Sequence, residues 1–183
     1  TLVPAGDGGV IVVDVRPAND HLWAQWLSPS GAPHWGQFGI PIRIFPFYGP
    51  HEPVAVSDGA GGVLVAWSED PNGLNAYDIR AQRIAPGIGR VWQASGVDIC
   101  AAAGPQAHAA IVSDGQGGAI VAWQDERAGA SSAHIYAQRF SADGVVQWAA
   151  DGVELCAVTG GQTYPRIVAD ASGGAIVAWT HTR

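Results

Sequence analysis

The heptapeptide Gly-Gly-x-x-Val-Ala-Trp returns at a constant interval, and it constrains the fold more than any other feature of the chain. Its closing tryptophans are Trp67, Trp123 and Trp179, which are 56 residues apart (123 − 67 and 179 − 123). An Ala-Gln-Arg tripeptide at 81–83 and 137–139 keeps the same step. A fixed period of this length indicates that one supersecondary unit is repeated and that neighbouring units bury each other.

The sequence pattern of each repeat unit predicts four short antiparallel strands. They are an apolar run before a Ser-Asp-Gly turn, the heptapeptide itself, a third strand such as 134–140 and a fourth such as 152–156. The Ser-Asp-Gly turn supplies a side-chain acceptor and a residue that tolerates positive φ, as tight hairpins require. A divergent first copy begins with Gly-Gly-Val-Ile-Val-Val-Asp at 8–14 and has a loop shorter by four residues. No segment shows helical spacing with a cap and a stop, so we expect essentially no helix.

The heptapeptide strand is apolar on both faces, as in Ala-Ile-Val-Ala-Trp at 119–123. A strand that is apolar on both sides is covered on both sides. Sheets that pack face to face around an axis meet this requirement. We therefore predict an all-β fold, a β-propeller-like array of four-stranded antiparallel blades, with a β-sandwich or a β-solenoid as the alternative.

A single repeat array is predicted to fill residues 1–183 with about 3.5 blades. Its units are 1–52, 53–108, 109–164 and a partial unit, 165–183. A closed propeller needs at least about four blades, and uncovered apolar edges aggregate. We therefore expect the array to be part of something larger. A longer polypeptide, a protein partner or a second copy would complete the blades, and two copies would supply about seven.

Composition excludes some classes of partner. The net charge is −7, only 14% of the residues are charged, and all nine cationic residues are arginine. A surface that follows nucleic-acid phosphates needs clustered cations, so we expect no nucleic-acid partner. No apolar stretch approaches the roughly 20 residues of a membrane helix, so we expect no membrane span. The opening residues show no signal peptide.

The segment Ile135–Gly144, which follows a Gly-Gly-Ala-Ile-Val-Ala-Trp strand and ends in Ser-Ala-Asp-Gly, resembles a known class of repeats. These repeats occur in secreted and cell-surface bacterial proteins of largely unknown function, and their layout is similar to the blades of TolB-type propellers. The present unit is longer, and Ser-Asp-Gly-x-Gly-Gly replaces the Ser-Pro-Asp-Gly of that pattern. The resemblance implies an extracytoplasmic propeller (secreted, periplasmic or on the cell surface) with a binding or scaffolding role, and it brings no catalytic residues.

Three aspartates recur with the repeat before glycine-rich turns, namely Asp58, Asp114 and Asp170. Oxygen-rich turns sometimes bind calcium, so these aspartates are the candidate calcium ligands. One carboxylate per loop supplies few ligands for a calcium ion, however, and capping of the turn is the favoured interpretation. We expect no other metal or cofactor, because Cys100 and Cys156 lack metal-binding spacing. Both cysteines are expected to be free thiols, because fourth strands of adjacent blades are too far apart for a disulfide.

A candidate partner surface comes from the first unit and from the variable loops. Tryptophans that recur with the repeat are explained by core packing, whereas Trp23 takes the place held by Arg80 and Tyr136 and is expected to face outward. Loops between the second and third strands are where repeat proteins place recognition. The candidate residues of this surface are Trp23, Trp35, Glu69, Asp70, Asp125, Glu126 and Arg127.

These features predict a non-enzymatic, extracytoplasmic module for structural or protein-interaction roles, as part of a larger propeller or multi-subunit assembly. The alternative is a propeller that binds or cleaves glycans. Cleavage needs paired carboxylates that converge with aromatic residues on one pocket. The repeats contain no such non-repeating acidic pair.

Overall fold

The computed structural model describes residues 1–16, 21–44 and 51–182, and within these ranges the one helical element is a 3-10 turn, η1 (Ala130–Ser132). All other regular structure is β-strand, arranged in four antiparallel sheets, so the all-β prediction is confirmed. Residues 17–20 and 45–50 of the predicted first unit, and residue 183 of the partial unit, lie outside the described residues.

Consecutive strands pair within the sheets, so each sheet is a meander, with the exception that β9 pairs with β7 and not with β8. The first sheet contains β1 (Leu2–Pro4), β2 (Val10–Arg16), β3 (His21–Leu27) and β4 (Ile40–Arg43). The second contains β5 (His51–Ser57), β6 (Val63–Glu69), β7 (Asp78–Ala85), β8 (Gly89–Arg90) and β9 (Val97–Cys100). The third contains β10 (Gln106–Ser113), β11 (Ala119–Asp125), β12 (His134–Phe140) and β13 (Val153–Glu154). The fourth contains β14 (Gly161–Ala169) and β15 (Ala175–Thr182).

The pairing of second and third strands follows the repeat. Trp67 lies opposite Arg80, and Trp123 lies opposite Tyr136. In the first sheet, Trp23 occupies the corresponding place on β3, opposite Asp14. The second sheet departs from the predicted four strands, because β8 and β9 both pair with β7. The short β8 arises where the turn after β7 folds back before the chain reaches β9.

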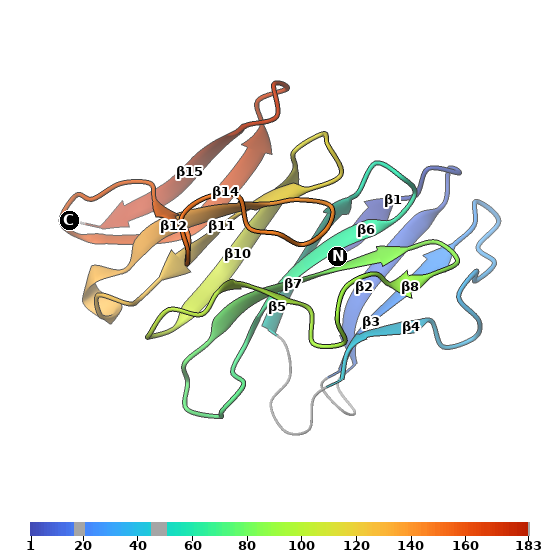
Figure 1. Ribbon diagram of the computed structural model, residues 1–183, viewed down its shortest axis with the longest axis horizontal. Coiled ribbons are helices and arrows are strands. Elements are labelled where there is room, and N and C mark those ends of the chain that lie inside the picture. Colours follow the sequence, from blue (N-terminus) through green and yellow to red (C-terminus); the bar gives the residue numbers. More distant parts are fainter. Residues whose placement is uncertain (17–20, 45–50, 183) are drawn as a thin grey trace.

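The four sheets follow one another along the long axis of the molecule, from β1–β4 at one end to β14–β15 at the other (Figure 1). Their first strands are neighbours, since β1 contacts β5, β5 contacts β10 and β10 contacts β14. Within the described ranges the sheets form an open series and do not close into a ring.

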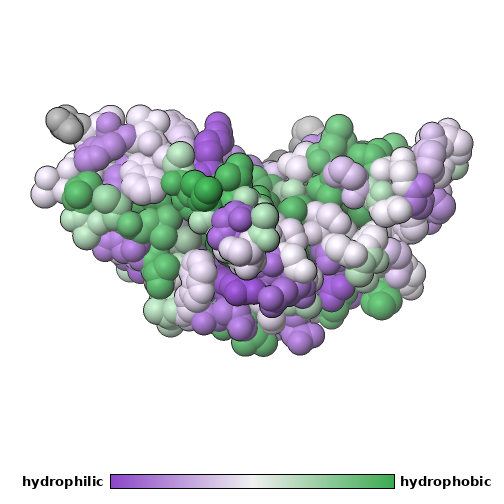
Figure 2. All heavy atoms as spheres, turned by 90° about the horizontal axis from the view of Figure 1, so that it is seen from above, coloured by the Kyte–Doolittle hydropathy of each residue, from purple (hydrophilic) through white to green (hydrophobic). Residues whose placement is uncertain are grey.

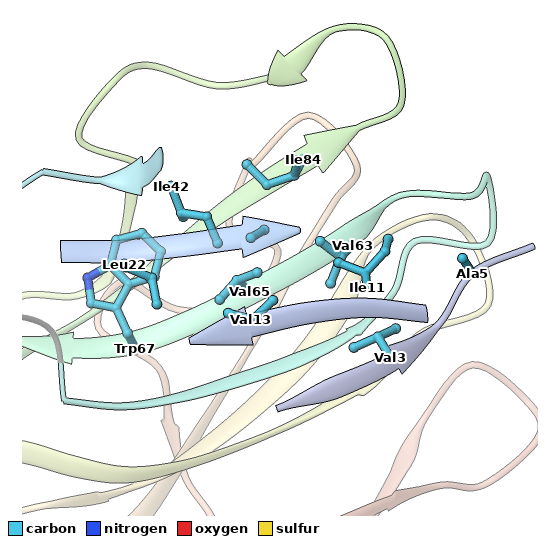
Figure 3. Packing of buried hydrophobic residues seen from close by; sticks show 11 residues of the cluster. Val3, Ala5, Ile11, Val13, Leu22, Ile42, Val63, Val65, Trp67 and Ile84 are labelled. Carbon is cyan, nitrogen blue, oxygen red and sulfur yellow. The ribbon is translucent and has the colours of Figure 1, made fainter. Parts of the chain in front are cut away.

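Both faces of β6 are buried, as the apolar pattern predicted. Val63, Val65 and Trp67 pack against the first sheet, where they join residues such as Ile11 and Leu22 in one cluster (Figure 3). The alternate residues Leu64 and Ala66 pack against the third sheet. Because successive side chains of a strand point to opposite faces, a single strand contributes to two cores.

β11 repeats this arrangement one sheet further on. Ala119, Val121 and Trp123 pack toward the second sheet, and Ala122 packs toward β14 and β15. All seven residues of β11 are buried. Sheets that pack face to face in series therefore account for the fully apolar heptapeptide strand in the second and third sheets.

The fourth sheet does not share this burial. Along β15 every residue is at least partly exposed, and Ile176 is 62% exposed. Among the recurring tryptophans, Trp148 is 38% exposed, so the core role predicted for it is wrong, whereas Trp179 is half-buried and packs against the cluster of Ala122, Ile135 and Ala137. The physical reason is that no further sheet of the described ranges covers this end of the molecule. Apolar residues reach the surface in the half of the molecule that contains this sheet, at the left of Figure 2.

Candidate binding site along the first strands

Three residues one repeat apart share a left-handed backbone. Glu52, His108 and Tyr164 are spaced by 56 residues (108 − 52 and 164 − 108), and their φ angles are 49°, 54° and 55°. Each lies at the point where the pairing of its first strand shifts register, in β5, β10 and β14. A left-handed conformation costs a non-glycine residue about 1–2 kcal/mol. Strained residues and β-bulges are frequent beside functional sites, so this row is the candidate site.

The three side chains meet across the boundaries between sheets. The backbone N–H of His108 donates to Oε2 of Glu52 at 3.1 Å, and Nδ1 of the same histidine lies 2.9 Å from that oxygen. On the other side, the rings of His108 and Tyr164 have centroids 4.6 Å apart. Through these contacts one carboxylate, one imidazole and one phenol form a continuous row across the three sheets, called here the first-strand row.

Two hollows flank the first-strand row. One, of about 340 Å³, lies on the Tyr164 side and is lined by Glu52, His108, Tyr164 and Arg166 together with the apolar residues Pro53, Val54 and Ala109. The other, of about 210 Å³, is lined by His51, Glu52, Ser68, Tyr77, Ala107 and His108. Both hollows therefore combine aromatic or apolar surface with groups that donate and accept hydrogen bonds.

Ser68 carries an unused hydrogen-bonding group in the smaller hollow. Ser68 is 2% exposed, and its Oγ has no hydrogen-bond partner within the described part of the chain. A buried hydroxyl without a partner is unfavourable, so a molecule in the hollow would gain by bonding to it. The neighbouring rings of His51 and Tyr77 meet edge to face, with centroids 5.2 Å apart.

The first-strand row was not recognised from the sequence. His51 and Glu52 open β5. The histidines of the chain do not recur at the 56-residue step, so His108 carries no signal of its own in the sequence. The available signal was positional, since Glu52, His108 and Tyr164 fall in one column of the repeat although their residue types differ.

The calcium candidates are used inside the protein. Oδ1 of Asp58 accepts the N–H groups of Ala60 and Gly62 at 2.8 Å, which caps the turn as predicted. Oδ2 of Asp58 pairs with the Arg83 guanidinium at 2.9 Å. A calcium ion at this carboxylate would have to displace the arginine.

Asp114 repeats these contacts, whereas Asp170 lacks part of them. Asp114 caps its turn through Gln116 and Gly118 and pairs with Arg139 at 2.9 Å. Asp170 makes the same turn bonds through Oδ1, and the backbone N–H groups that it accepts keep the pKa of its carboxyl below the usual value. No arginine or histidine of the described residues pairs with it. The three ranges described also contain no group of three or more His, Cys, Asp or Glu side chains placed to hold a metal.

The loop acids of the second sheet are buried, which corrects their predicted place on a partner surface. Glu69 is fully buried; it accepts the indole N–H of Trp67 at 2.8 Å, and Arg80 lies 3.0 Å away. Asp70 is 5% exposed and accepts backbone N–H groups of its own loop, such as that of Asn75 at 2.6 Å. These carboxylates hold the loop and the strand end together, so they are not available to a partner.

In the third sheet, Asp125 is likewise buried, which corrects its predicted place on the partner surface. Oδ2 of Asp125 accepts the indole N–H of Trp123 at 2.8 Å and a guanidinium N–H of Arg127 at 2.6 Å. Arg127 also lies over the ring of Tyr136, 3.9 Å from its centroid. Glu126 accepts a bond from Gln124 at 3.0 Å. Of the three candidate residues in this loop, Glu126 and Arg127 remain partly exposed.

The two tryptophans of the first unit do not form a free aromatic patch. Trp23 is partly exposed, and the Arg16 guanidinium lies over its ring, 4.0 Å from the centroid. Trp35 packs against the core between the first two sheets and meets the ring of Trp26 edge to face. Packing against arginine and core residues therefore accounts for both side chains.

Both cysteines are free, as predicted. Cys100 is 1% exposed, and burial raises the pKa of its thiol to about 12. A thiol with such a pKa is hardly ionised at neutral pH, so Cys100 is a poor nucleophile. Cys156 is partly exposed.

Comparisons with known proteins bear on the fold alone. No protein-family model matches the chain, and no curated protein matches it in sequence. One crystal structure that is similar is an N-acetylgalactosamine deacetylase from F. plautii in complex with blood group B trisaccharide. The TM-score is 0.51 and the sequence identity 13%; the match covers 90% of this chain and 60% of the deacetylase chain. This chain thus spans less than two thirds of that protein. Within the described ranges, no helix is long and apolar enough to cross a bilayer.

Proposed function

We propose that this protein is a non-enzymatic, extracytoplasmic interaction module, built as a β-propeller-like array and part of a larger propeller or multi-subunit assembly. The face-to-face sheets with neighbouring first strands support the propeller-like layout. The location outside the cytoplasm rests on the resemblance of the repeat to those of secreted and cell-surface bacterial proteins.

The observation that carries the proposal is the first-strand row. The repeat fixes the same strained conformation three times, while the side chains change from Glu52 to His108 to Tyr164. A position whose geometry is constant and whose chemistry varies suits recognition better than packing. The loop acids, by contrast, serve the interior, as Glu69 and Asp125 do.

Binding suits the first-strand row better than hydrolysis. Among the described residues that line either hollow, Glu52 is the one carboxylate, and its charge faces the imidazole of His108 at 2.9 Å. Glycoside cleavage uses two carboxylates that flank the bond. An interaction role needs only that complementary groups converge in a preformed hollow.

Carbohydrate binding is a second candidate function. Tyr164 is 56% exposed and offers a ring face, next to the hydrogen-bonding groups of Glu52 and His108. Aromatic side chains with an apolar face and a polar end suit ligands that are partly apolar and partly hydroxylated. The similar deacetylase structure holds a trisaccharide, which adds to this candidate.

A comparison of His108→Ala and Tyr164→Ala with the unchanged protein tests both candidates. Ile88→Ala, on an exposed turn outside the row, is the matched control. A photo-reactive residue at position 166, where exposed Arg166 lines the larger hollow, would report contact with a protein partner on producing cells, and a glycan array would report carbohydrate binding. We expect one of these signals to be lost in both row variants and kept in the control.

Two results would overturn the proposal. If the row variants changed neither the cross-linking signal nor the glycan-array signal, the first-strand row would not be the interaction site. If the unchanged protein converted a glycan of the array chemically and the His108→Ala variant did not, the protein would be an enzyme. Product analysis by mass spectrometry separates the second result from simple binding.

A further inference from the structure

We propose that the β14–β15 sheet binds a β-hairpin of the same repeat class, carried on another polypeptide segment, whose arginine pairs with Asp170 and whose Asp-Gly turn receives Trp148. The inference rests on the proposed function in one respect, because it takes the array to be part of a larger assembly. It goes further by defining the chemistry of the segment that β15 binds.

The first argument is the incomplete ion pair at Asp170. In the second and third sheets, the turn aspartate pairs with an arginine 25 residues further along, Arg83 for Asp58 and Arg139 for Asp114. That arginine lies on the third strand of the same sheet. Asp170 has the same turn bonds from Ser172 and Gly174 and no cationic partner in the described part of the chain. Its site therefore has the charge and geometry to accept a guanidinium from a third strand.

The second argument is the uncovered face and edge of β15. Ile176 is 62% exposed, whereas its repeat equivalents Leu64 and Ile120 are 0% and 2% exposed. β15 pairs with β14 along one edge, and no strand of the described ranges pairs with its other edge. An apolar strand with a free edge is a template for the addition of a further strand.

The third argument is Trp148. Its repeat equivalent Trp92 packs on the next sheet: the indole N–H donates to the carbonyl oxygen of Ala142 at 3.1 Å, and the ring meets Phe140 edge to face. Gly144 allows this approach, since a Cβ there would lie 2.9 Å from the indole of Trp92. No such turn covers Trp148 in the part of the chain that the structure describes, and Trp148 is 38% exposed.

A groove joins these features. It has a volume of about 490 Å³, and its lining includes Arg139, Trp148, Asp170 and Val177. The groove thus reaches from the third sheet to the turn that Asp170 caps. In the preceding pair of sheets, the equivalent residues Arg83 and Trp92 both donate to the carbonyl of Ala142, so the turn after β12 occupies the corresponding space.

The third sheet supplies the expected register. Val121 lies opposite Gln138 of β12, and Ile120 lies opposite Arg139. Transferred by one repeat, the glutamine of the bound hairpin lies opposite Val177 and its arginine opposite Ile176. The stated chemistry is therefore an Ala-Gln-Arg strand followed by an Asp-Gly turn.

A second copy of the chain is disfavoured as the occupant. Its Ala-Gln-Arg strands, β7 and β12, are already in place in their own sheets, with Arg83 and Arg139 paired to aspartates. Two copies that joined through β15 would therefore supply no Ala-Gln-Arg strand to either Asp170 turn.

The test uses the chain's own hairpin as the probe. A fluorescent peptide with the sequence of residues 134–154 contains the third strand, the Asp-Gly turn and Trp148. We expect the fluorescence anisotropy of this peptide to rise when the full chain is added, and we expect the bound peptide to protect the β15 amides from hydrogen exchange. Arg139→Gln in the peptide, which leaves the protein unchanged, should weaken binding about tenfold, because it removes a charge-assisted hydrogen bond.

Variants of the protein complete the test. Asp170→Asn in the protein should weaken binding of the unchanged peptide to the same degree, and it should not further weaken binding of the Arg139→Gln peptide. The control Asp143→Asn, at an exposed residue, should have no effect on binding. Binding that is absent, or equal for both peptides, would overturn the inference. Self-association in sedimentation, with β15 amides protected in the absence of peptide, would instead identify a second copy and would also overturn it. His108→Ala should not affect peptide binding, so failure here and failure of the proposed function remain distinguishable.

Discussion

Both the backbone N–H and the imidazole Nδ1 of His108 lie against the same oxygen of Glu52, at 3.1 and 2.9 Å. The two residues are one repeat apart and belong to different sheets. The contact is possible because each residue has a left-handed backbone at a bulge of its first strand. The repeat thus brings equivalent positions of neighbouring sheets into direct contact.

Tyr164 offers a direct test of the backbone strain. In an ordinary strand, alanine is more stable than glycine by about 0.5–1 kcal/mol. At φ 55° the order reverses, because a Cβ is unfavourable in the left-handed region. We expect Tyr164→Gly to be more stable than Tyr164→Ala by about 1 kcal/mol in urea unfolding. The same pair at Val168, in the regular part of β14, is the control, and an alanine variant that is the more stable at both sites would contradict the strain.

Arg139 is expected to be essential for the third sheet. Its removal leaves the buried carboxylate of Asp114 without its cation, which costs about 3 kcal/mol when one partner of a buried pair is lost. Arg139→Ala should therefore lower the unfolding midpoint strongly, whereas Arg166→Ala, at an exposed position, should change it little. Equal effects of the two substitutions would show that the Asp114 pair contributes no stability.

Asp78 makes stability depend on pH. Burial raises the pKa of its carboxyl to about 6, and the carboxylates of Asp98 and Glu69 add to the effect. The folded protein therefore holds a proton at Asp78 at pH values where the unfolded chain, with a pKa near 3.8, has lost it. The stabilisation from this proton is lost as the pH rises from about 4 through about 6.

Substitution of Asp78 by asparagine tests that linkage. Solvent screens the partly exposed carboxylate, so the gain is small, about 1 kcal/mol or less. We expect Asp78→Asn to raise the melting temperature at pH 7.5 by about 2 °C and not at pH 4. The exposed Asp143→Asn variant should show no such difference. A gain of the same size at both pH values would contradict the raised pKa.

The two thiols should react at different rates. Cys156 is partly exposed, whereas Cys100 is buried with a pKa raised to about 12. A disulfide reagent at pH 8 is expected to modify one thiol rapidly and the second only after unfolding in guanidinium. Cys156→Ser should abolish the rapid phase. Two rapid phases would show that the Cys100 site opens readily.

Calcium should have no effect on stability. Each of Asp58 and Asp114 gives one oxygen to its turn and the other to an arginine, so a calcium ion gains no free ligand. We expect the melting temperature in excess EDTA and in millimolar CaCl₂ to agree within about 1 °C, because an ion that does not bind the folded state does not stabilise it. A rise with calcium that Asp170→Asn removes would return this carboxylate to the list of ligands.

The local structure was largely predictable from the sequence. The constant interval between Trp67, Trp123 and Trp179 located equivalent strands, and the Ser-Asp-Gly turns located the hairpins. The side chains that meet in the first-strand row were not predictable in this way. Their contact depends on left-handed bulges and on adjacent sheets, and the residue types of Glu52, His108 and Tyr164 share no motif.

The loop acids show the same limit. Glu69 and Asp125 look like solvated loop residues in the sequence, because charged side chains are mostly exposed. In the structure each accepts the indole N–H of a tryptophan two residues before it and lies beside an arginine. Such pairing allows a carboxylate to be buried, and it depends on side chains from other strands or from the following loop.

The pentapeptide Ala-Ile-Val-Ala-Trp occurs at 119–123 and again, unchanged, at 175–179. In both places the sequence determined an extended strand that pairs with the strand before it. The tertiary structure alone decided that the first copy is buried on both faces and that the second is partly exposed throughout. The physical reason is that apolar side chains specify a need for cover, whereas the cover itself comes from the neighbouring sheet.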